Sequence, residues 1–220
     1  MKGKYLISDN AGLTLTFDTQ EWEGDINLSS DLGTSGYPQM ISTTSALGDD
    51  DGSRDRVSLS FDFSAQSRLY DNGSLSIYSQ ETDQRQVTNL NKNILGNFVN
   101  GPRGPQFVPN IPPTPINEFK DYIFDQSIEG FTLQFFKSLK SESGIRQNIV
   151  YGAEQESIDV TRPRYRTETN LLTQAINSNI GGELYPNKTF PDTETVRTAF
   201  FINNRICLLY TSPSPRDPIG

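Results

Sequence analysis

Apolar and polar residues alternate in several stretches of the first hundred residues. The alternation is complete over residues 57–63 (VSLSFDF) and recurs more briefly over residues 13–17 and 74–78. A period of two is typical of a β-strand that buries one face only. Residues 71–73 (DNG) favour a turn, because Asn and Gly tolerate the left-handed backbone conformation that a hairpin turn needs. We therefore expect residues 57–63 and 74–78 to pair within an antiparallel β-unit that spans residues 1–100.

Polar and proline-rich segments surround these expected strands. Residues 29–55 and 79–97 are rich in Ser, Thr, Asp, Asn and Gly, which predicts long surface loops. Residues 101–116 (GPRGPQFVPNIPPTPI) contain repeated prolines, which fix φ and lack a backbone donor. We expect this stretch to be a linker or an extended arm. Pro109 and Pro112 also have the spacing of a ligand for a partner's aromatic groove, which is the alternative interpretation.

The sequence changes character after the proline-rich stretch. Residues 169–180 carry apolar side chains at helical spacing, followed by Gly181 and Gly182 as a C-terminal cap, and this predicts a helix. The apolar positions of that stripe are Leu171, Leu172, Ala175, Ile176 and Ile180. Residues 131–135 fit a strand or a helix, and residues 195–202 favour a strand.

The predicted fold class is therefore α+β and β-rich. It combines a β-rich domain over residues 1–100, a Pro-rich connector over 101–116 and a mixed segment with one clear helix over 117–206. No run of 18 apolar residues is present, so no transmembrane helix is expected. The first residues lack the apolar stretch and small-residue cleavage site of a signal peptide.

The end of the chain has an unusual composition. The segment from Cys207 to Asp217 (CLLYTSPSPRD) can be encoded by DNA that resembles the transposase end and adapter of transposon-based sequencing libraries. We interpret residues 207–220 as a non-native, adapter-derived tail and leave them out of the fold prediction. On this interpretation the natural sequence is truncated after Ile206, and the segment 117–206 is incomplete.

Composition limits the chemistry that the chain can perform. The sequence has no histidine and one cysteine, which lies in the tail, so neither a Ser-His-Asp triad nor an imidazole metal site can form. We therefore expect no catalytic residues, no cofactor and no enzymatic function, with a fragment of an enzyme as one alternative. The formal net charge is −8, which argues against nucleic-acid binding because such proteins present a basic patch.

An acidic cluster spans residues 48–55 (GDDDGSRD). Calcium is coordinated by six to eight oxygens, and closely spaced aspartates beside glycine can supply several of them. Asp49, Asp51 and Asp55 are the candidate calcium ligands. The alternative is a solvated acidic loop that Arg54 and Arg56 partly neutralise.

A second acidic cluster surrounds the only tryptophan. Glu21, Glu23 and Asp25 alternate beside Trp22, and on a strand they would share one face. Paired carboxylates with an aromatic platform are typical of glycosidases, whereas like charges on an edge strand discourage aggregation, which is the interpretation we favour. Trp22 is also a candidate binding residue for a glycan.

One basic cluster follows at residues 162–166 (RPRYR). Arg162, Arg164 and Arg166 alternate on an extended segment and are candidate binding residues for phosphate, carboxylate or an acidic partner. Because the first half of the chain is acidic, an internal or intersubunit charge contact is the simpler interpretation.

These features lead to a ranking of functions. The first expectation is a structural or assembly protein, a virion component of a tailed bacteriophage of the tail or baseplate type. It would bind protein partners or itself, lie in the virion or in the cytoplasm before assembly, and contact neither nucleic acid nor membrane. The alternative is a surface β-domain that binds glycan or protein through exposed aromatics such as Trp22, Tyr37 and Tyr70.

Overall fold

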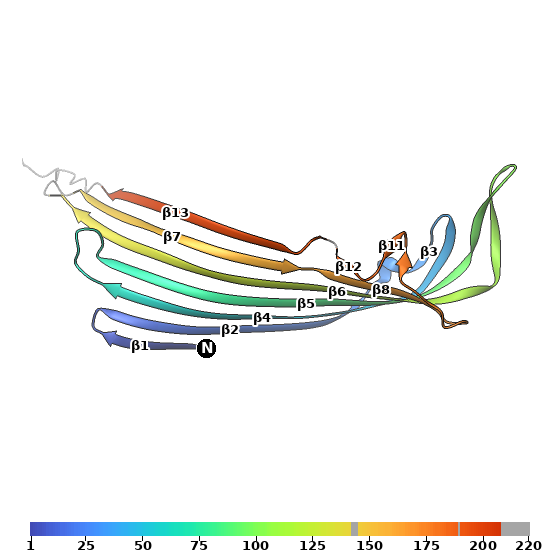
Figure 1. Ribbon diagram of the computed structural model, residues 1–220, viewed down its shortest axis with the longest axis horizontal. Coiled ribbons are helices and arrows are strands. Elements are labelled where there is room, and N and C mark those ends of the chain that lie inside the picture. The colour runs from blue at the N-terminus through green and yellow to red at the C-terminus, as the bar shows by residue number, and fades with distance from the viewer. Residues whose placement is uncertain (142–144, 189, 208–220) are drawn as a thin grey trace, which may run out of the picture.

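The protein is dominated by one elongated, curved antiparallel sheet, and residues 179–184 add a separate two-stranded sheet (Figure 1). The computed structural model describes residues 1–141, 145–188 and 190–207. Its strands run up and down as a meander in the order β1-β2-β4-β5-β6-β7-β13, so each long strand pairs with its neighbour in the sequence. The N-terminal strand and β13 form opposite edges of this sheet.

The strands of the sheet are unusually long. The meander consists of β1 (Lys2–Ser8), β2 (Ala11–Asn27), β4 (Gln39–Ser64), β5 (Asn72–Gly101), β6 (Gly104–Lys140), β7 (Arg146–Thr161) and β13 (Thr193–Cys207). The shorter elements are a 3-10 turn η1 (Ser29–Asp31), β3 (Gly33–Ser35), β8 (Pro163–Asn170), β9 (Ile176–Asn177), β10 (Asn179–Ile180), β11 (Glu183–Leu184) and β12 (Asn187–Lys188). β6 reaches its length of 37 residues because β7 pairs with one part of it and β8 with another.

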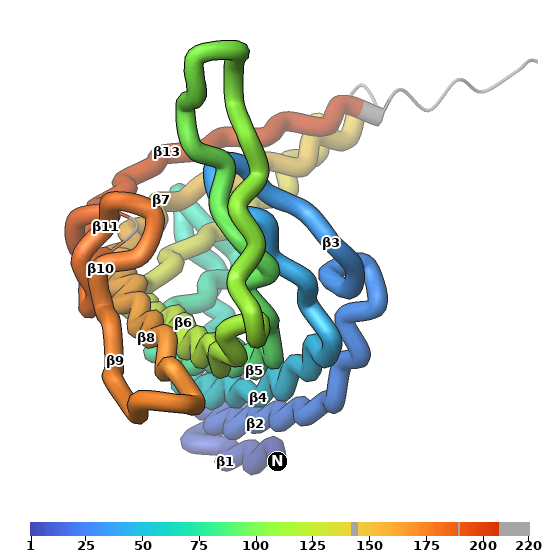
Figure 2. The backbone as a smooth tube through the Cα atoms, turned by 90° about the vertical axis from the view of Figure 1, so that its right-hand side faces the viewer, coloured from blue at the N-terminus to red at the C-terminus, as the bar shows by residue number. Residues whose placement is uncertain are grey.

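The predicted pairing of residues 57–63 with residues 74–78 is confirmed, because Phe61 lies opposite Leu75 in the β4–β5 ladder. The predicted α+β class is wrong, since the described part of the chain contains no helix longer than the short turn η1. The same sheet runs through residues 1–100 and 117–206. Figure 2 shows the strands arranged as a curved trough when the molecule is viewed from one end.

The predicted helix over residues 169–180 is replaced by the end of β8, a turn and two short strands. The Asn170 side-chain oxygen accepts hydrogen bonds from the backbone N–H groups of Leu172 and Thr173, which stabilises the turn. Gln174 then has a φ of 60°, which a helix does not allow. Of the apolar stripe, Ile180 is buried, but Leu172 and Ile176 stay 64% and 70% exposed, and a short helix with most of its apolar face unpacked is marginal in water.

The predicted loops 29–55 and 79–97 lie largely within β4 and β5, and the predicted connector 101–116 lies largely within β6. Polar residues are tolerated because neighbouring strands on both sides provide the backbone hydrogen bonds. The prolines occupy the first part of β6, which pairs with β5 alone. The other edge of this part has no partner strand, so a residue that lacks a backbone N–H donor is tolerated there. This β5–β6 hairpin projects from one end of the sheet (Figure 1).

The interior is small for a chain of this length. Among the described residues, the buried apolar side chains are Ala46, Leu90, Ile180 and Tyr185. They lie toward the end of the sheet where β9 and β12 pair with β8. The rest of the sheet is a single layer in the described structure, so its apolar side chains remain accessible. Residues 207–220, predicted to be a non-native tail, lie outside the described residues apart from Cys207.

We predict that adding one methyl group at Gly152 destabilises the sheet. A Cβ there would collide with the Leu133 carbonyl oxygen and lie 2.7 Å from the Phe201 ring. Gly152→Ala should lower the free energy of unfolding by roughly 1–3 kcal/mol, as overpacking does, measured by chemical denaturation. Gly24→Ala is the matched control, because no atom lies within 4 Å of its Cβ position. Equal stability of the two variants would contradict this packing.

Candidate functional site

The two faces of the sheet differ along the length of its strands. Residues that lie directly opposite one another in the ladders share a face, and successive residues alternate between faces. One face, which we call the assembly face, carries Leu59 and Ile77 in one cross-strand row and Asp51 in another. The other, which we call the rear face, carries Ser60 and Ser76.

Apolar side chains gather on the assembly face toward the β4–β5 turn. The apolar patch consists of Leu13, Leu15, Phe17, Val57, Leu59, Phe61, Leu75, Ile77, Phe131, Leu133, Val196 and Phe200. Ile77 is 49% exposed at its centre, and Phe200 is 83% exposed on the edge strand β13. A sheet normally buries one such face against a second layer, and the described residues supply none here.

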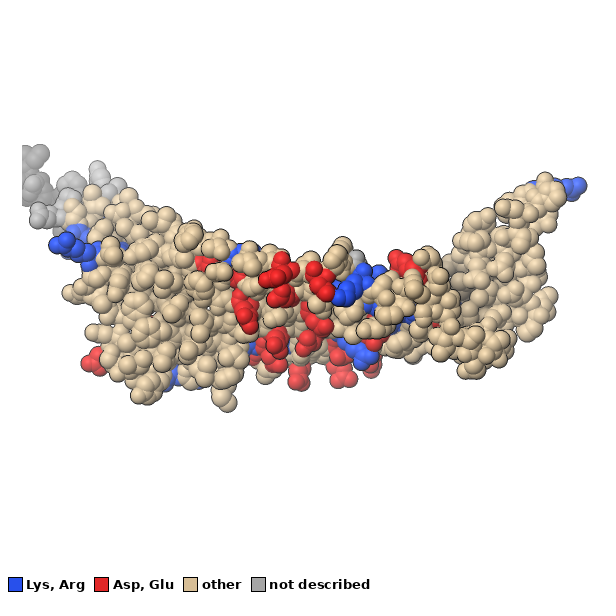
Figure 3. Space-filling view, viewed as in Figure 1, with Lys and Arg blue, Asp and Glu red and all other residues tan. Residues whose placement is uncertain are grey.

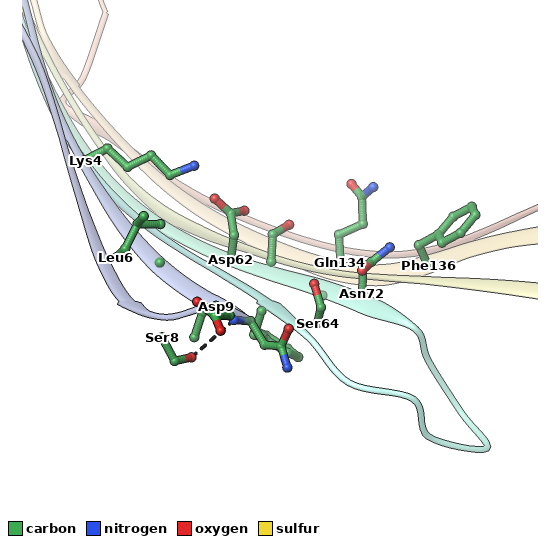
Figure 4. Close-up of a pocket in the computed structure, with 15 residues that line it drawn as sticks. Lys4, Leu6, Ser8, Asp9, Asp62, Ser64, Asn72, Gln134 and Phe136 are labelled. Atoms are coloured by element: carbon green, nitrogen blue, oxygen red, sulfur yellow. Dashed lines mark hydrogen bonds between the residues drawn. The ribbon is translucent and has the colours of Figure 1, made fainter.

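The rear face opposite the patch is polar. Ser60 and Ser76 hydrogen-bond across the strands at 3.0 Å, and the Tyr78 hydroxyl donates to Glu156 Oε1 at 3.0 Å. Figure 4 shows Asp62 and Gln134 projecting together from this side, at a shallow hollow of about 420 Å³. The two faces therefore have the in-out alternation expected of a sheet with one solvated and one covered side.

The far side of the patch is closed by an aromatic cluster. Tyr70, from the β4–β5 turn, packs edge-on against Phe63 at 5.6 Å and at a tilt against Phe135 at 5.2 Å, and Phe135 stacks on Tyr151. The Lys137 ammonium donates to Asp71 Oδ1 at 2.7 Å and holds the turn over this end. The turn thus covers the last row of the assembly face and leaves the patch open.

Carboxylates occupy the middle of the assembly face. This acidic band consists of Glu21, Glu23, Asp25, Asp49, Asp51, Asp55, Glu81, Asp83, Asp121, Asp125, Asp159 and Glu194. Figure 3 shows a concentration of acidic side chains in the middle of the molecule, between ends that carry few charges. Within the band, Arg85 forms a bidentate pair with Asp121 at 2.9 and 2.7 Å. The excess of carboxylates leaves the band strongly negative.

The predicted calcium ligands Asp49, Asp51 and Asp55 all lie in this band, on a continuous strand. The expected loop is absent, so their side chains are spaced along β4 at about 7 Å per pair of residues and do not curl around one point. No cluster of three or more His, Cys, Asp or Glu able to hold a metal ion occurs in the described residues. Calcium binding stays a prediction from the sequence alone.

A buried ion cluster lies on the rear face near the other end of the strands. Glu118 has no exposed surface. Its carboxylate accepts from Lys92 Nζ and from Arg166 Nε at 2.5 Å, and Lys120 Nζ lies 3.7 Å away. Lys92 lies on β5, Glu118 and Lys120 lie on β6, and Arg166 lies on β8. The pairing of these three strands, in which Leu90, Glu118 and Glu168 form one cross-strand row, brings the four charged groups together.

The surrounding cations fix the ionisation of Glu118. Burial alone raises the pKa of this carboxyl, but Lys92, Lys120 and Arg166 together hold it below its ordinary value of 4.5. Because three cations face one carboxylate, loss of that carboxylate would leave buried positive charge without a partner.

The predicted arginine cluster is divided between these contacts. Arg166 binds Glu118, while Arg162 and Arg164 lie over the rings of Phe124 and Tyr122 at 4.7 and 4.9 Å. Arg164 and Arg166 also lie over the ring of Tyr185, so the three arginines make contacts within the chain through one ion pair and four cation-π pairs.

No family model matches the chain, and no curated protein matches it either. Within the described residues, no helix has the length and apolar character needed to span a membrane. Interpretation of the site therefore rests on its own geometry.

The predicted aromatic binding residues do not meet on one surface. Trp22 covers Gly52 on the rear face, where a Cβ on the glycine would touch its ring. Tyr37 packs at a tilt against Phe98, with the ring centroids 5.6 Å apart, near the projecting hairpin, and Tyr70 belongs to the aromatic cluster at the opposite end. Trp22 shares a cross-strand row with Gln84 and Phe124. It lies three strands away from Phe124, the ring that Arg162 covers.

Neither the Glu118 cluster nor the apolar patch as one continuous surface was predicted from the sequence. Lys92 and Glu118 are far apart in the sequence, and only the register of β5 on β6 brings them together. The patch was visible in part, because residues 13–17, 57–63 and 74–78 alternate. Nothing in their alternation indicated that all of them face the same uncovered side.

We predict that Glu118→Gln destabilises the protein by about 3 kcal/mol at pH 7, because three cations lose their anion. A carboxyl with a lowered folded pKa adds stability above its unfolded pKa and loses it as the pH falls through the folded pKa. The unfolding free energy of the natural sequence should therefore drop below about pH 4.5, and more steeply than that of the variant. Glu168→Gln, in the same row, is the control; an equal effect there would contradict the assignment.

We also predict that the acidic band limits stability by repulsion. Glu23 lies directly opposite Asp51. Like charges in that position destabilise a sheet, so Glu23→Gln should stabilise the fold by about 0.5 kcal/mol in low salt. Sodium chloride should raise the melting temperature of the natural sequence and shrink this difference. A larger rise with millimolar calcium than with sodium chloride of equal ionic strength would favour a specific calcium site instead. Glu21→Gln, opposite Ser53, is the matched control.

Proposed function

We propose that the chain is a structural assembly protein, a virion component of a tailed bacteriophage of the tail or baseplate type. The observation that carries the structural part of this proposal is the uncovered apolar patch, of which Ile77 and Phe131 form the centre. An exposed apolar surface of this size on a protein marks a contact with another macromolecule.

The edge of the sheet supports the same role. β13 pairs with β7 on one side, and in the described part of the chain no strand pairs with its other side. Val196, Phe200 and Ile202 are exposed on this strand. A long apolar edge is a template for pairing with another chain, and soluble monomers usually protect such edges.

The composition is consistent with a role that needs no chemistry. Histidine is absent, and Ser, Thr, Asn and Gln are frequent in the strands outside the patch and the band. The assignment to a tailed bacteriophage, as opposed to another assembly, comes from this general character of the sequence. A platform for glycan binding gains no support, because Trp22, Tyr37 and Tyr70 lie apart.

Genomic context tests this proposal. On a long contig that carries the gene, we expect neighbouring genes for capsid, portal or tail proteins, and tryptic peptides of the chain in purified particles. A long contig without any virion gene, or peptides found in the host fraction alone, would overturn the proposal. Among these peptides, one should contain Glu23 and another should contain Phe131, because the acidic band and the apolar patch belong to the same chain.

A further inference from the structure

We infer that the apolar patch is covered by the same patch of a second copy of this chain, with the strands of the two copies running in opposite directions. The inference rests on the proposed structural role and names the partner that the role requires. Three observations carry it: the size of the patch, its position beside the acidic band, and the central place of β5.

The size of the patch suits an interface between copies. Its most exposed members range from Leu59 and Phe131 at 37% to Phe200 at 83% exposure. Together its partly exposed side chains present on the order of 1,000 Å² of surface, which is comparable with the roughly 800 Å² per partner of a standard interface. The apolar faces of two sheets pack against each other about 10 Å apart in a β-sandwich.

The acidic band decides the direction of the second copy. If two copies packed with their strands in the same direction, the bands would face each other along with the patches. Reversing one copy around the centre of the patch places each band beyond the end of its partner. The centre of the band lies about 25 Å along β4 from the centre of the patch, so the two bands end about 50 Å apart. That separation far exceeds the Debye length of about 8 Å, so the repulsion between the bands is screened.

The strand order then identifies which residues meet. β5 is the middle strand of the seven in the meander. In the reversed arrangement the axis crosses all strands at the level of Leu59, Ile77 and Phe131, so each of these residues faces its own copy. Asp83, on the same strand and the same face as Ile77, lies far from its copy in this arrangement. It would face its copy if the two chains ran in the same direction.

Single cysteines on β5 test the arrangement. In a Cys207→Ser background, Ile77→Cys, Asp83→Cys and Ser76→Cys are each treated with a short bis-maleimide cross-linker. We expect Ile77→Cys to give a covalent dimer. Ser76→Cys should not, because it lies on the rear face, and Asp83→Cys should not, because the bands are apart. Circular dichroism confirms that all three variants retain the sheet.

The other outcomes overturn the inference in different ways. Cross-linking of Asp83→Cys as efficiently as Ile77→Cys would show copies running in the same direction. A sedimentation coefficient of a trimer or a larger oligomer for the untreated protein would show another symmetry. An assembled protein in which Ile77→Cys stays uncross-linked would show that another surface joins the copies. A folded monomer in sedimentation velocity would overturn self-association while virion neighbours of the gene could still uphold the proposed function.

A charge placed in the patch provides a second measurement. Ile77→Asp buries an unpaired carboxylate at the axis and should raise the dimer dissociation constant by about 100-fold or more. Ser76→Asp adds the same charge to the rear face at the neighbouring position and should leave the constant unchanged. Equal constants for the two variants would place the interface elsewhere.

Discussion

A β-sheet must bury one of its faces, and the rest of this structure depends on how that requirement is met. Folding must offset a large loss of conformational entropy, mainly through burial of apolar surface. Among the described residues only Ala46, Leu90, Ile180 and Tyr185 form a buried apolar core. The long ladders satisfy the backbone, but the apolar patch still faces outward. A second layer from another chain resolves this imbalance.

Charged and apolar side chains are concentrated in different zones along the sheet. At one end the buried carboxylate of Glu118 and its cations, Lys92 and Arg166 among them, tie β5, β6 and β8 together. In the middle the acidic band keeps the assembly face charged. At the other end the patch lies open beside the exposed edge of β13. In the proposed assembly, the apolar patch determines where another chain binds. Repulsion between the acidic bands determines the direction in which it binds.

Part of this fold was predictable from the sequence, and the reasons are physical. Residues 57–63 alternate strictly, so their strand and its pairing with residues 74–78 were predicted correctly. The helix over 169–180 was wrong because helical spacing stabilises a helix only when the apolar stripe is packed, and Leu172 has no such partner. The polar parts of β4 and β5 show no alternation of apolar and polar residues. They are extended because they pair with the neighbouring strands, which the sequence of these parts does not indicate. The charge pairing of Glu118 depends on the same register and left no local trace.

Hydroxyl-radical footprinting of the intact protein can show whether the apolar patch is buried in the assembled state. Phe200 and Tyr37 are both highly exposed aromatic side chains in the single chain, at 83% and 66%. We expect Phe200 and Ile77 to be protected from oxidation at concentrations where the protein assembles, and Tyr37 to be oxidised readily. Oxidation of Phe200 and Tyr37 to the same extent in the assembled protein would contradict this expectation.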